Sequence, residues 1–275
     1  MRVPAFAKIN LSLRVLGTRA DGYHELRTIF QSIALHDTLT IRAIRGPFRL
    51  TCDDPACPAD ETNLIWRAAD RMWNAAGRRG ALRDVAIHLE KQIPMQAGLG
   101  GGSSDCAAAL RALAKRWRVA DARVREAAIA LGADVPYFLE GGTVLGLERG
   151  DLLFPLLDAP PAWVVLVLPD FGVSTKEAFG WFDGDPRSTK SIPELSNDLE
   201  APVAARHTEI ARIISALRRH GAGQAAMSGT GSAVFGLFSS RSTAVQAASR
   251  VRSACRSIVV TRTLNRSKYQ TLAGT

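Results

Sequence analysis

Long apolar runs are missing from the sequence, and this argues against a membrane-spanning helix. In 275 residues, no stretch approaches the roughly 18 uninterrupted apolar residues that such a helix requires. The N-terminus also lacks the long apolar segment of a signal peptide, because Lys8, Asn10 and Arg14 interrupt it. We therefore expect a cytoplasmic protein with no membrane partner.

Cysteine is also scarce, and its spacing matches no common metal site. The four cysteines form no Cys-x-x-Cys pair and have no histidine at ligand-like spacing, which argues against a zinc finger. Their number and spacing favour reduced thiols, as in most cytosolic proteins. The four residues are Cys52, Cys57, Cys106 and Cys255.

Acidic residues are outnumbered by basic ones, 26 to 35, which gives a formal net charge of +9. A positive surface attracts nucleic acid, an anionic membrane or a phosphorylated small molecule. Basic side chains recur in residues 111–118 and 212–220, but at helical spacing between apolar positions, which is typical of a solvated helix face. The sequence has no arginine–glycine repeat and no low-complexity tail. Charge alone therefore leaves a nucleic-acid-binding protein open as an alternative to an enzyme.

Apolar spacing in the first half predicts a mixed α and β domain. Residues 84–91 alternate as a half-buried strand does. A helix is expected from Ser104 onward, with residues 103–105 as cap candidates, and another over 122–131.

The second half has the pattern of a second domain. The proline-containing stretch 158–162 indicates a linker, so we expect an N-terminal domain over 1–157 and a C-terminal domain over 158–275. Beyond the linker, the order of elements is similar to a split β-α-β sandwich with an added helix. The expected strands are 163–169, 232–238 and 257–264, and the expected helices are 205–220 and 242–255.

A glycine-rich stretch lies between the strand expected at 84–91 and the helix expected from Ser104. Residues 94–110, PMQAGLGGGSSDCAAAL, place four glycines and two serines before an alanine-rich run. They are not a Walker A loop, because no lysine follows the glycines, and Ser103 stands where a dinucleotide fingerprint needs its third glycine. Main-chain N–H groups at a helix N-terminus bind anions, and glycine lets phosphate oxygens reach them. The stretch predicts a phosphate cradle; the structural alternative is a plain strand–helix turn.

Three separated motifs resemble those of the GHMP small-molecule kinases. Besides the glycine loop, residues 4–26 are similar to the family's N-terminal motif, and residues 225–238 to its C-terminal glycine motif. The resemblance spans nearly the whole chain. It implies the α+β, two-domain GHMP kinase fold, with an N-terminal domain like one of a ribosomal protein and a ferredoxin-like C-terminal domain. The active site is then expected in the cleft between the domains.

Four short segments narrow the resemblance to one branch of the family. They are DGYHEL at 21–26, GLGGGSSD at 98–105, LGADVPYFL at 131–139 and SGTGSAVF at 228–235. They imply ATP-dependent phosphorylation of the 2-hydroxyl of a cytidine-diphosphate-linked methylerythritol, in the non-mevalonate route to isoprenoids. A homoserine or mevalonate kinase is the enzyme alternative, although those substrates carry no cytosine.

The resemblance also implies roles for single residues. Asp134 is expected to be the general base, with Lys8 beside it to orient it and to stabilise developing charge. Tyr23 and His24 match positions that hold the cytosine ring by stacking and hydrogen bonds. Further substrate contacts are expected at Asn10, Thr175, Phe179, Gly229, Thr230 and Gly231, together with Asp134.

ATP and Mg²⁺ are the implied cofactors, and the glycine loop is their expected site. The residues matched to the ATP site are Asn63, Leu64, Lys91, Pro94, Gly98, Leu99, Gly100, Gly101, Gly102, Ser103, Ser104 and Asp105. Asn63 and Leu64 match the adenine pocket, and Ser104 is a candidate contact for Mg²⁺. We expect Asp105, which stands where some relatives have asparagine, to cap the helix. We expect a monomer or a weak homodimer with no nucleic-acid partner.

Overall fold

Two β-sheets form the framework of residues 1–184, 196–251 and 255–274, which the computed structural model describes. The first sheet has six strands in the order β3-β4-β2-β5-β6, with β1 paired to β2. β3 and β4 run parallel, and the other pairs are antiparallel. The strands are β1 (Arg2–Thr18), β2 (His24–Pro47), β3 (Arg49–Cys52), β4 (Arg83–Glu90), β5 (Thr143–Glu148) and β6 (Leu152–Pro155).

The long strand β2 organises the first sheet, since three strands pair with it. β5 pairs with its residues 26–31, and β4 with its residues 38–47. β1 pairs with β2 along most of both strands, with register shifts just before Lys8 and just after Asn10. Such irregularities re-aim side chains, and here they frame two of the predicted site residues.

Four helices cover one face of the first sheet. They are α1 (Leu64–Ala75), α2 (Gly101–Trp117), α3 (Asp121–Leu131) and α4 (Tyr137–Glu140). α2 is central because its alanine-rich stretch, residues 107–109, is fully buried in the core that the sheet and these helices share. Small side chains let the helix lie close to its neighbours. Among all helices of the described residues, none is long and apolar enough to cross a bilayer.

The second sheet has four antiparallel strands in the order β10-β7-β9-β8. Its strands are β7 (Trp163–Leu168), β8 (Gln224–Met227), β9 (Val234–Phe238) and β10 (Ser257–Arg262). The helices of this half are α5 (Thr175–Asp183), α6 (Glu200–Arg206), α7 (Thr208–Arg219) and α8 (Arg241–Val251). Along the chain the order is strand, helices, two strands, helix, strand, as in a ferredoxin-like unit. The predicted fold class is confirmed.

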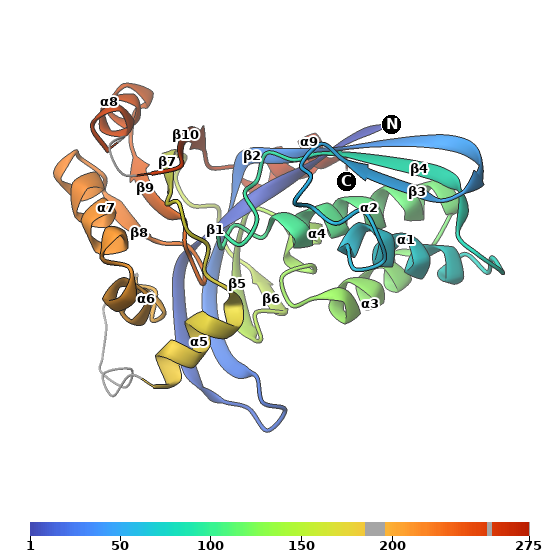
Figure 1. Cartoon of the computed structure of the whole chain (residues 1–275), viewed down its shortest axis with the longest axis horizontal. Helices are drawn as coiled ribbons and strands as arrows, with labels where there is room; N and C mark the ends of the chain where they lie inside the picture. Colours follow the sequence, from blue (N-terminus) through green and yellow to red (C-terminus); the bar gives the residue numbers. More distant parts are fainter. Residues whose placement is uncertain (185–195, 252–254, 275) are drawn as a thin grey trace.

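The two halves are joined by a shared core and by two chain crossings. Ile9 of β1, Leu99 of the glycine loop and Phe235 of β9 belong to one buried apolar cluster between the sheets. After β10 the chain returns to the first half as α9 (Arg266–Ala273), where the buried Tyr269 donates to the Phe138 carbonyl at 2.7 Å. Figure 1 shows α1–α4 on one side of the molecule and α6–α8 on the other, with both termini on the side of α1–α4.

The start of α2 differs from the prediction. The helix expected from Ser104 begins at Gly101, and Gly100 is its N-cap with φ of 71°. No side chain caps this end, so residues 103–105 do not act as the expected caps. The left-handed conformation of the glycine turns the chain into the helix directly, one turn before the serines would have done so.

Two later helices also differ from the prediction. The helix expected over 205–220 corresponds largely to α7, and its first two residues, 205 and 206, are instead the end of α6. His207, with φ of −126° and ψ of 82°, separates the two helices. α8 ends at Val251, and residues 252–254 of the expected helix 242–255 lie outside the described residues.

Candidate active site

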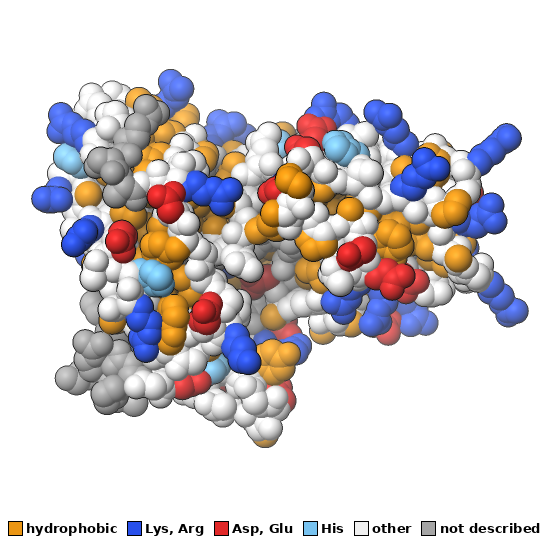
Figure 2. All heavy atoms as spheres, viewed as in Figure 1, with side chains coloured by type: hydrophobic (Ala, Val, Ile, Leu, Met, Phe, Trp, Pro, Cys, Tyr) orange, Lys and Arg blue, Asp and Glu red, His pale blue; other side chains and the backbone are white. Residues whose placement is uncertain are grey.

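A large cavity between the two halves holds most of the predicted site residues. Its volume is about 1240 Å³, and Figure 2 shows the surface hollowed between the halves. The predicted residues that line it are Lys8, Asn10, Tyr23, His24, Leu64, Lys91, Pro94, Gly98, Leu99, Gly100, Gly101, Gly102, Ser103, Asp134, Thr175, Phe179, Gly229 and Thr230. Those outside the lining are Asn63, Ser104, Asp105 and Gly231.

Lys8 and Asp134, far apart in the sequence, meet in this cavity. Lys8 Nζ lies 3.5 Å from Asp134 Oδ2, and the two side chains are 4% and 31% exposed. β1 carries the lysine, and the turn between α3 and α4 carries the aspartate. The pair places a partly exposed carboxylate, which can accept a proton, beside a buried cation.

Hydrogen bonds among side chains of β1 and β2 hold the Lys8 ammonium in place. Lys8 Nζ donates to Asn10 Oδ1 at 2.6 Å, and Asn10 Nδ2 donates to Thr28 Oγ1 at 2.7 Å. The ammonium also lies 5.4 Å from the centre of the Phe30 ring, within the range of a cation–π contact. All four side chains belong to buried residues. The position of the charge is therefore built into the sheet.

The N-terminus of α2 presents backbone donors without acceptors. The Ser104 amide is the first that finds an acceptor, the Gly100 carbonyl at 2.8 Å. The N–H groups of Gly101, Gly102 and Ser103 donate to no acceptor in the part of the chain that the structure describes. The positive end of the helix dipole lies at the same point. These donors can bind an anion such as a phosphate group.

The loop before α2 packs against the loop between β8 and β9. Ser228 Oγ donates to the Gly98 carbonyl at 2.9 Å, and the main-chain N–H of Asn10 donates to Ser228 Oγ at 3.2 Å. Asn197 Nδ2 holds the second loop by donating to the Gly229 carbonyl at 2.6 Å. The two glycine motifs, which are far apart in the sequence, therefore form one wall of the cavity.

Gly98 packs directly against the backbone of Ser228 in the second loop, and alanine there should destabilise the protein. Gly98 has φ of 72°, and a Cβ would lie 2.0 Å from the Ser228 carbonyl oxygen. We expect Gly98→Ala to lower the free energy of unfolding by about 3 kcal/mol, measured by urea denaturation. Gly102→Ala is the control, because its Cβ would meet nothing within 4 Å. Equal stability of the two variants would contradict the close packing.

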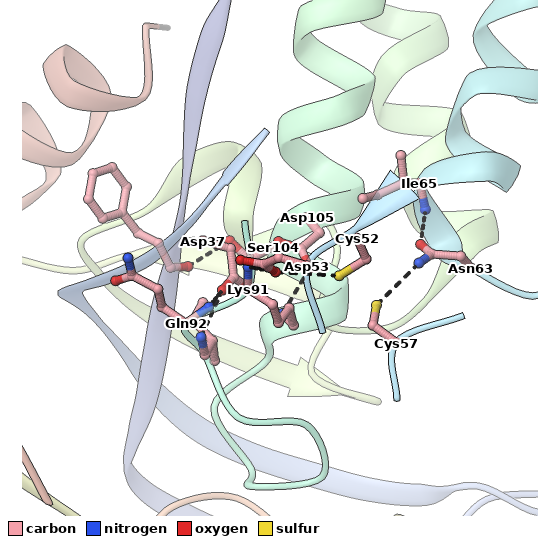
Figure 3. Close-up of polar contacts among 12 residues, drawn as sticks. Asp37, Cys52, Asp53, Cys57, Asn63, Ile65, Lys91, Gln92, Ser104 and Asp105 are labelled. Atoms are coloured by element: carbon pink, nitrogen blue, oxygen red, sulfur yellow. Dashed lines mark hydrogen bonds and ion pairs between the residues drawn. The ribbon is translucent and has the colours of Figure 1, made fainter. Parts of the chain in front are cut away.

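Lys91 forms a buried ionic cluster with Asp37 and Asp105 (Figure 3). Lys91 Nζ donates to Asp37 Oδ2 and, at 2.9 Å, to Asp105 Oδ2, and the three side chains are at most 5% exposed. Asp37 Oδ1 accepts from the Gln92 and Ile93 amides, so it holds the segment that leads into the glycine loop. The prediction that Asp105 caps α2 is wrong, because its carboxyl group serves this cluster.

Burial disfavours the charged form of Asp105 in this cluster. Burial raises its pKa well above the usual 3.8; Lys91 opposes this shift, and Asp37 adds to it. Asp105 Oδ1 is buried without a hydrogen-bond partner among the described residues. Since the folded state binds this proton more tightly than the unfolded state, stability falls as the pH rises from 3.8 toward the folded-state value.

Asparagine at position 105 should remove this pH-dependent cost. We expect the free energy of unfolding of Asp105→Asn, relative to the wild type, to increase as the pH rises above about 4.5. Urea denaturation at several pH values measures it. The control is Asp60→Asn, since hydrogen bonds from Thr62 lower the pKa of the exposed Asp60. Its difference from the wild type should stay constant over this range. A constant difference for Asp105→Asn would refute the raised pKa.

Ser104 and Asn63 are two further predicted ATP contacts that have partners inside the protein. Ser104 is 1% exposed, and its Oγ donates to the Phe6 carbonyl at 2.7 Å, which does not support the expected contact with Mg²⁺. Ser103 is the loop serine that lines the cavity. Asn63 is the N-cap of α1, and its Oδ1 accepts from the Ile65 amide at 2.9 Å.

Aromatic rings gather where the start of β2 faces α5. The His24 ring stacks on Phe179, with centroids 4.5 Å apart and planes 17° apart. Its Nε2 lies 2.8 Å from Asp183 Oδ1. Tyr23 is 57% exposed, and the Arg149 guanidinium lies 5.3 Å from its ring centre. All five residues line the cavity, so this wall offers an aromatic surface and several polar groups.

Several residues that contact the predicted site residues were not identified from the sequence. Asp37, Arg149, Asp183 and Asn197 each contact a predicted site residue or its loop from a distant part of the chain. None lies in one of the quoted motifs. A single charged or amide residue without a motif carries no signal in one sequence, so only the fold could reveal them.

Comparison with known proteins identifies relatives over most of the chain. Residues 63–142 match the model of the GHMP kinases N-terminal domain, and residues 184–257 match that of the GHMP kinases C-terminal domain. A 4-diphosphocytidyl-2-C-methyl-D-erythritol kinase of Moorella thermoacetica is 42% identical over 96% of this chain and 99% of its own. One of Pelotomaculum thermopropionicum is 41% identical over 95% of this chain and 97% of its own.

Comparison with solved structures points to the same family as these relatives. The crystal structure of a 4-(cytidine 5'-diphospho)-2C-methyl-D-erythritol kinase matches with a TM-score of 0.82 and 34% identity, over 96% of this chain and 99% of that one. A mevalonate kinase matches with a TM-score of 0.71 but 13% identity, which shows a shared fold alone. The predicted enzyme class is confirmed over the nucleic-acid-binding alternative. The chain belongs to the GHMP kinases and, among them, to the family of 4-diphosphocytidyl-2-C-methyl-D-erythritol kinases.

Proposed function

We propose that this enzyme transfers the terminal phosphoryl group of ATP to the 2-hydroxyl of 4-diphosphocytidyl-2-C-methyl-D-erythritol. The relatives named for this kinase support the substrate. The observation that carries the reaction is the Lys8–Asp134 pair, 3.5 Å apart, in the same cavity as the N-terminus of α2. A base, a cation and a phosphate cradle in one cavity are what phosphoryl transfer to an alcohol requires.

The N-terminus of α2 is the proposed site of the ATP phosphates. The N–H groups of Gly101, Gly102 and Ser103, which have no acceptor in the described chain, would donate to phosphate oxygens. Lys91 and Leu64 line the same cavity, and Leu64 is proposed to contact the adenine. Asn63 would support that pocket indirectly, because it caps α1 just before Leu64.

Mg²⁺ is proposed to enter with ATP, and it would neutralise charge on the phosphate oxygens when bound. The described residues contain no cluster of three or more acidic, histidine or cysteine side chains suited to a metal. Magnesium commonly takes most of its ligands from phosphates and water, so this chain fits such a cation. The hydroxyl of Ser103, in the cavity lining, is the oxygen the loop would contribute.

Asp134 is the proposed general base. Its carboxylate would take the proton of the attacking hydroxyl group as the oxygen approaches the phosphorus atom. Lys8 would stabilise the negative charge that develops on the transferred group. Asn10 holds the lysine ammonium at 2.6 Å, so the charge need not reorganise during the reaction.

The aromatic wall is the proposed cytidine site. Tyr23, with its exposed ring, would stack on the cytosine, and His24 would hydrogen-bond to its edge. Phe179 backs His24, and Thr175 lies one turn earlier on α5. The loop with Gly229 and Thr230 would receive the substrate phosphates. Gly231 lies outside the cavity lining and would act by shaping this loop.

Release of ADP by the purified enzyme tests the proposed function. The assay uses Mg²⁺ and ATP with the cytidine substrate, and homoserine and mevalonate as alternative acceptors. We expect turnover with the cytidine substrate alone. Turnover with homoserine or mevalonate alone would support a kinase activity but refute the roles proposed for Tyr23 and His24. A folded protein that releases no ADP with any acceptor would refute the phosphate site.

We further propose the division of the chain into domains over 1–157 and 158–275, with α9 packed back on the first. A cytoplasmic location is proposed from the use of ATP, and a monomer or weak homodimer as the working form. Sedimentation velocity at several protein concentrations tests the last point, and a stable tetramer would refute it.

A further inference from the structure

His24 is held in one orientation by contacts on three sides. Phe179 stacks on one face of its ring, and Phe182 meets the ring at 87° with centroids 6.4 Å apart. Asp183, at the end of α5, lies 2.8 Å from Nε2. The histidine side chain is 13% exposed. A flip of the ring would exchange Nε2 for a carbon atom and lose the contact with Asp183.

The contact with Asp183 decides which ring nitrogen carries the proton. A carboxylate accepts hydrogen bonds, so Nε2 of His24 must be the donor. In a neutral imidazole the other nitrogen, Nδ1, is then an acceptor. No donor reaches Nδ1 from the part of the chain that the structure describes, and His24 lines the cavity. The ligand site therefore contains one unused acceptor.

An unused acceptor distinguishes the two common pyrimidines of nucleotides. Cytosine carries an amino donor at the ring position where uracil, like thymine, carries a carbonyl acceptor. An acceptor at His24 Nδ1 pairs with the amino group and repels the carbonyl. We propose that Asp183 is a positioning residue that fixes the tautomer of His24 and thereby makes the enzyme prefer cytidine over uridine diphosphate ligands.

This inference rests on the proposed function, in which His24 meets the pyrimidine edge, and it deepens that function. Asp183 is 54% exposed and lies in the last turn of α5, so its substitution removes a hydrogen bond without emptying a core position. It acts through the histidine. Its loss should therefore alter ligand preference and leave the phosphoryl-transfer step unchanged.

Binding of CDP and UDP to the full-length enzyme, measured by calorimetry, tests the preference. We expect Asp183→Ala to reduce the ratio of CDP to UDP affinity by about tenfold, with kcat for the cytidine substrate unchanged. The affinity ratio of Asp183→Asn should lie between those of the wild type and Asp183→Ala, since an amide can either accept from Nε2 or donate to it. Asp21→Asn is the matched control, because Asp21 accepts from the Tyr23 amide without touching His24. It should keep the wild-type ratio.

Nitrogen-15 NMR of the His24 ring reports the tautomer without any need for turnover. The wild type should show a protonated Nε2 and an unprotonated Nδ1, and Asp183→Ala a mixture of the two tautomers. A protonated Nδ1 in the neutral wild-type ring, or an unchanged affinity ratio in Asp183→Ala, would overturn the proposal. Failure of the wild type to phosphorylate the cytidine substrate would refute the proposed function instead, while the ligand ratio and the spectrum still decide the role of Asp183.

Discussion

Asp134→Asn is expected to lower kcat by about a thousandfold while the protein stays folded. Asparagine keeps the size of the side chain but has no carboxylate to take the hydroxyl proton. It also removes the ionic partner of Lys8, whose Nζ lies 3.5 Å from Asp134 Oδ2. Because Asp134 lies in a partly exposed turn, the core is not disturbed. ADP release at saturating ATP and cytidine substrate measures kcat.

A matched control separates this effect from general loss of acidic charge. Asp121→Asn replaces an exposed carboxylate at the start of α3, the helix that precedes the Asp134 turn. It should leave kcat within about twofold of the wild type, as surface substitutions do. If Asp134→Asn also retained wild-type kcat, another group would have to accept the proton, and the role given to Asp134 would be wrong.

Lys91→Met is expected to lower the free energy of unfolding by about 3–5 kcal/mol near neutral pH. The variant removes the cation from a cluster in which Asp37 and Asp105 are both buried. A buried carboxylate without its partner is strongly destabilising, whereas methionine itself fills the space well. Urea denaturation measures the loss. It should shrink at acidic pH, because burial raises the pKa of Asp105 and its carboxyl group is then neutral in both proteins.

Two further variants distinguish the cluster from an ordinary lysine effect. Lys115→Met changes an exposed lysine of α2 and should alter stability by less than about 0.5 kcal/mol. Adding Asp37→Asn to Lys91→Met should restore part of the lost stability, because it removes the uncompensated charge. If the double variant were less stable than Lys91→Met, the amide contacts of Asp37, and not its charge, would dominate.

Local patterns predicted the parts of the fold that depend on local chemistry. The strand expected at 84–91 is β4, Arg83–Glu90, because alternation along a half-buried strand is visible in a short window. The glycine loop was recognised because its backbone conformation requires glycine. The structure brings Lys8 and Asp134 to within 3.5 Å, as their expected cooperation requires, while their catalytic roles remain predictions.

Contacts across the fold were beyond the reach of the sequence. Asp105 reads as a helix cap, because an acidic residue near a helix start usually serves as one. Its actual partners are Lys91 and, through it, Asp37 on β2, and nothing local to residue 105 indicates them. His24 likewise matched a ligand contact, but its link to Asp183 exists only because α5 packs beside the start of β2.

The return of the chain to its first half, through α9, has a consequence for how the halves can move. The outgoing linker, 158–162, and the returning segment run as a hydrogen-bonded seam. The Thr263 N–H donates to the Ala162 carbonyl, and the Ala162 N–H donates to Thr263 Oγ1, both at 3.0 Å. The main-chain N–H of Arg266 donates to Asp158 Oδ1, also at 3.0 Å. Two bonded segments of chain resist twisting more than a single tether does. Together with the buried cluster of Ile9, Leu99 and Phe235, this seam holds the two walls of the cavity in one relative orientation.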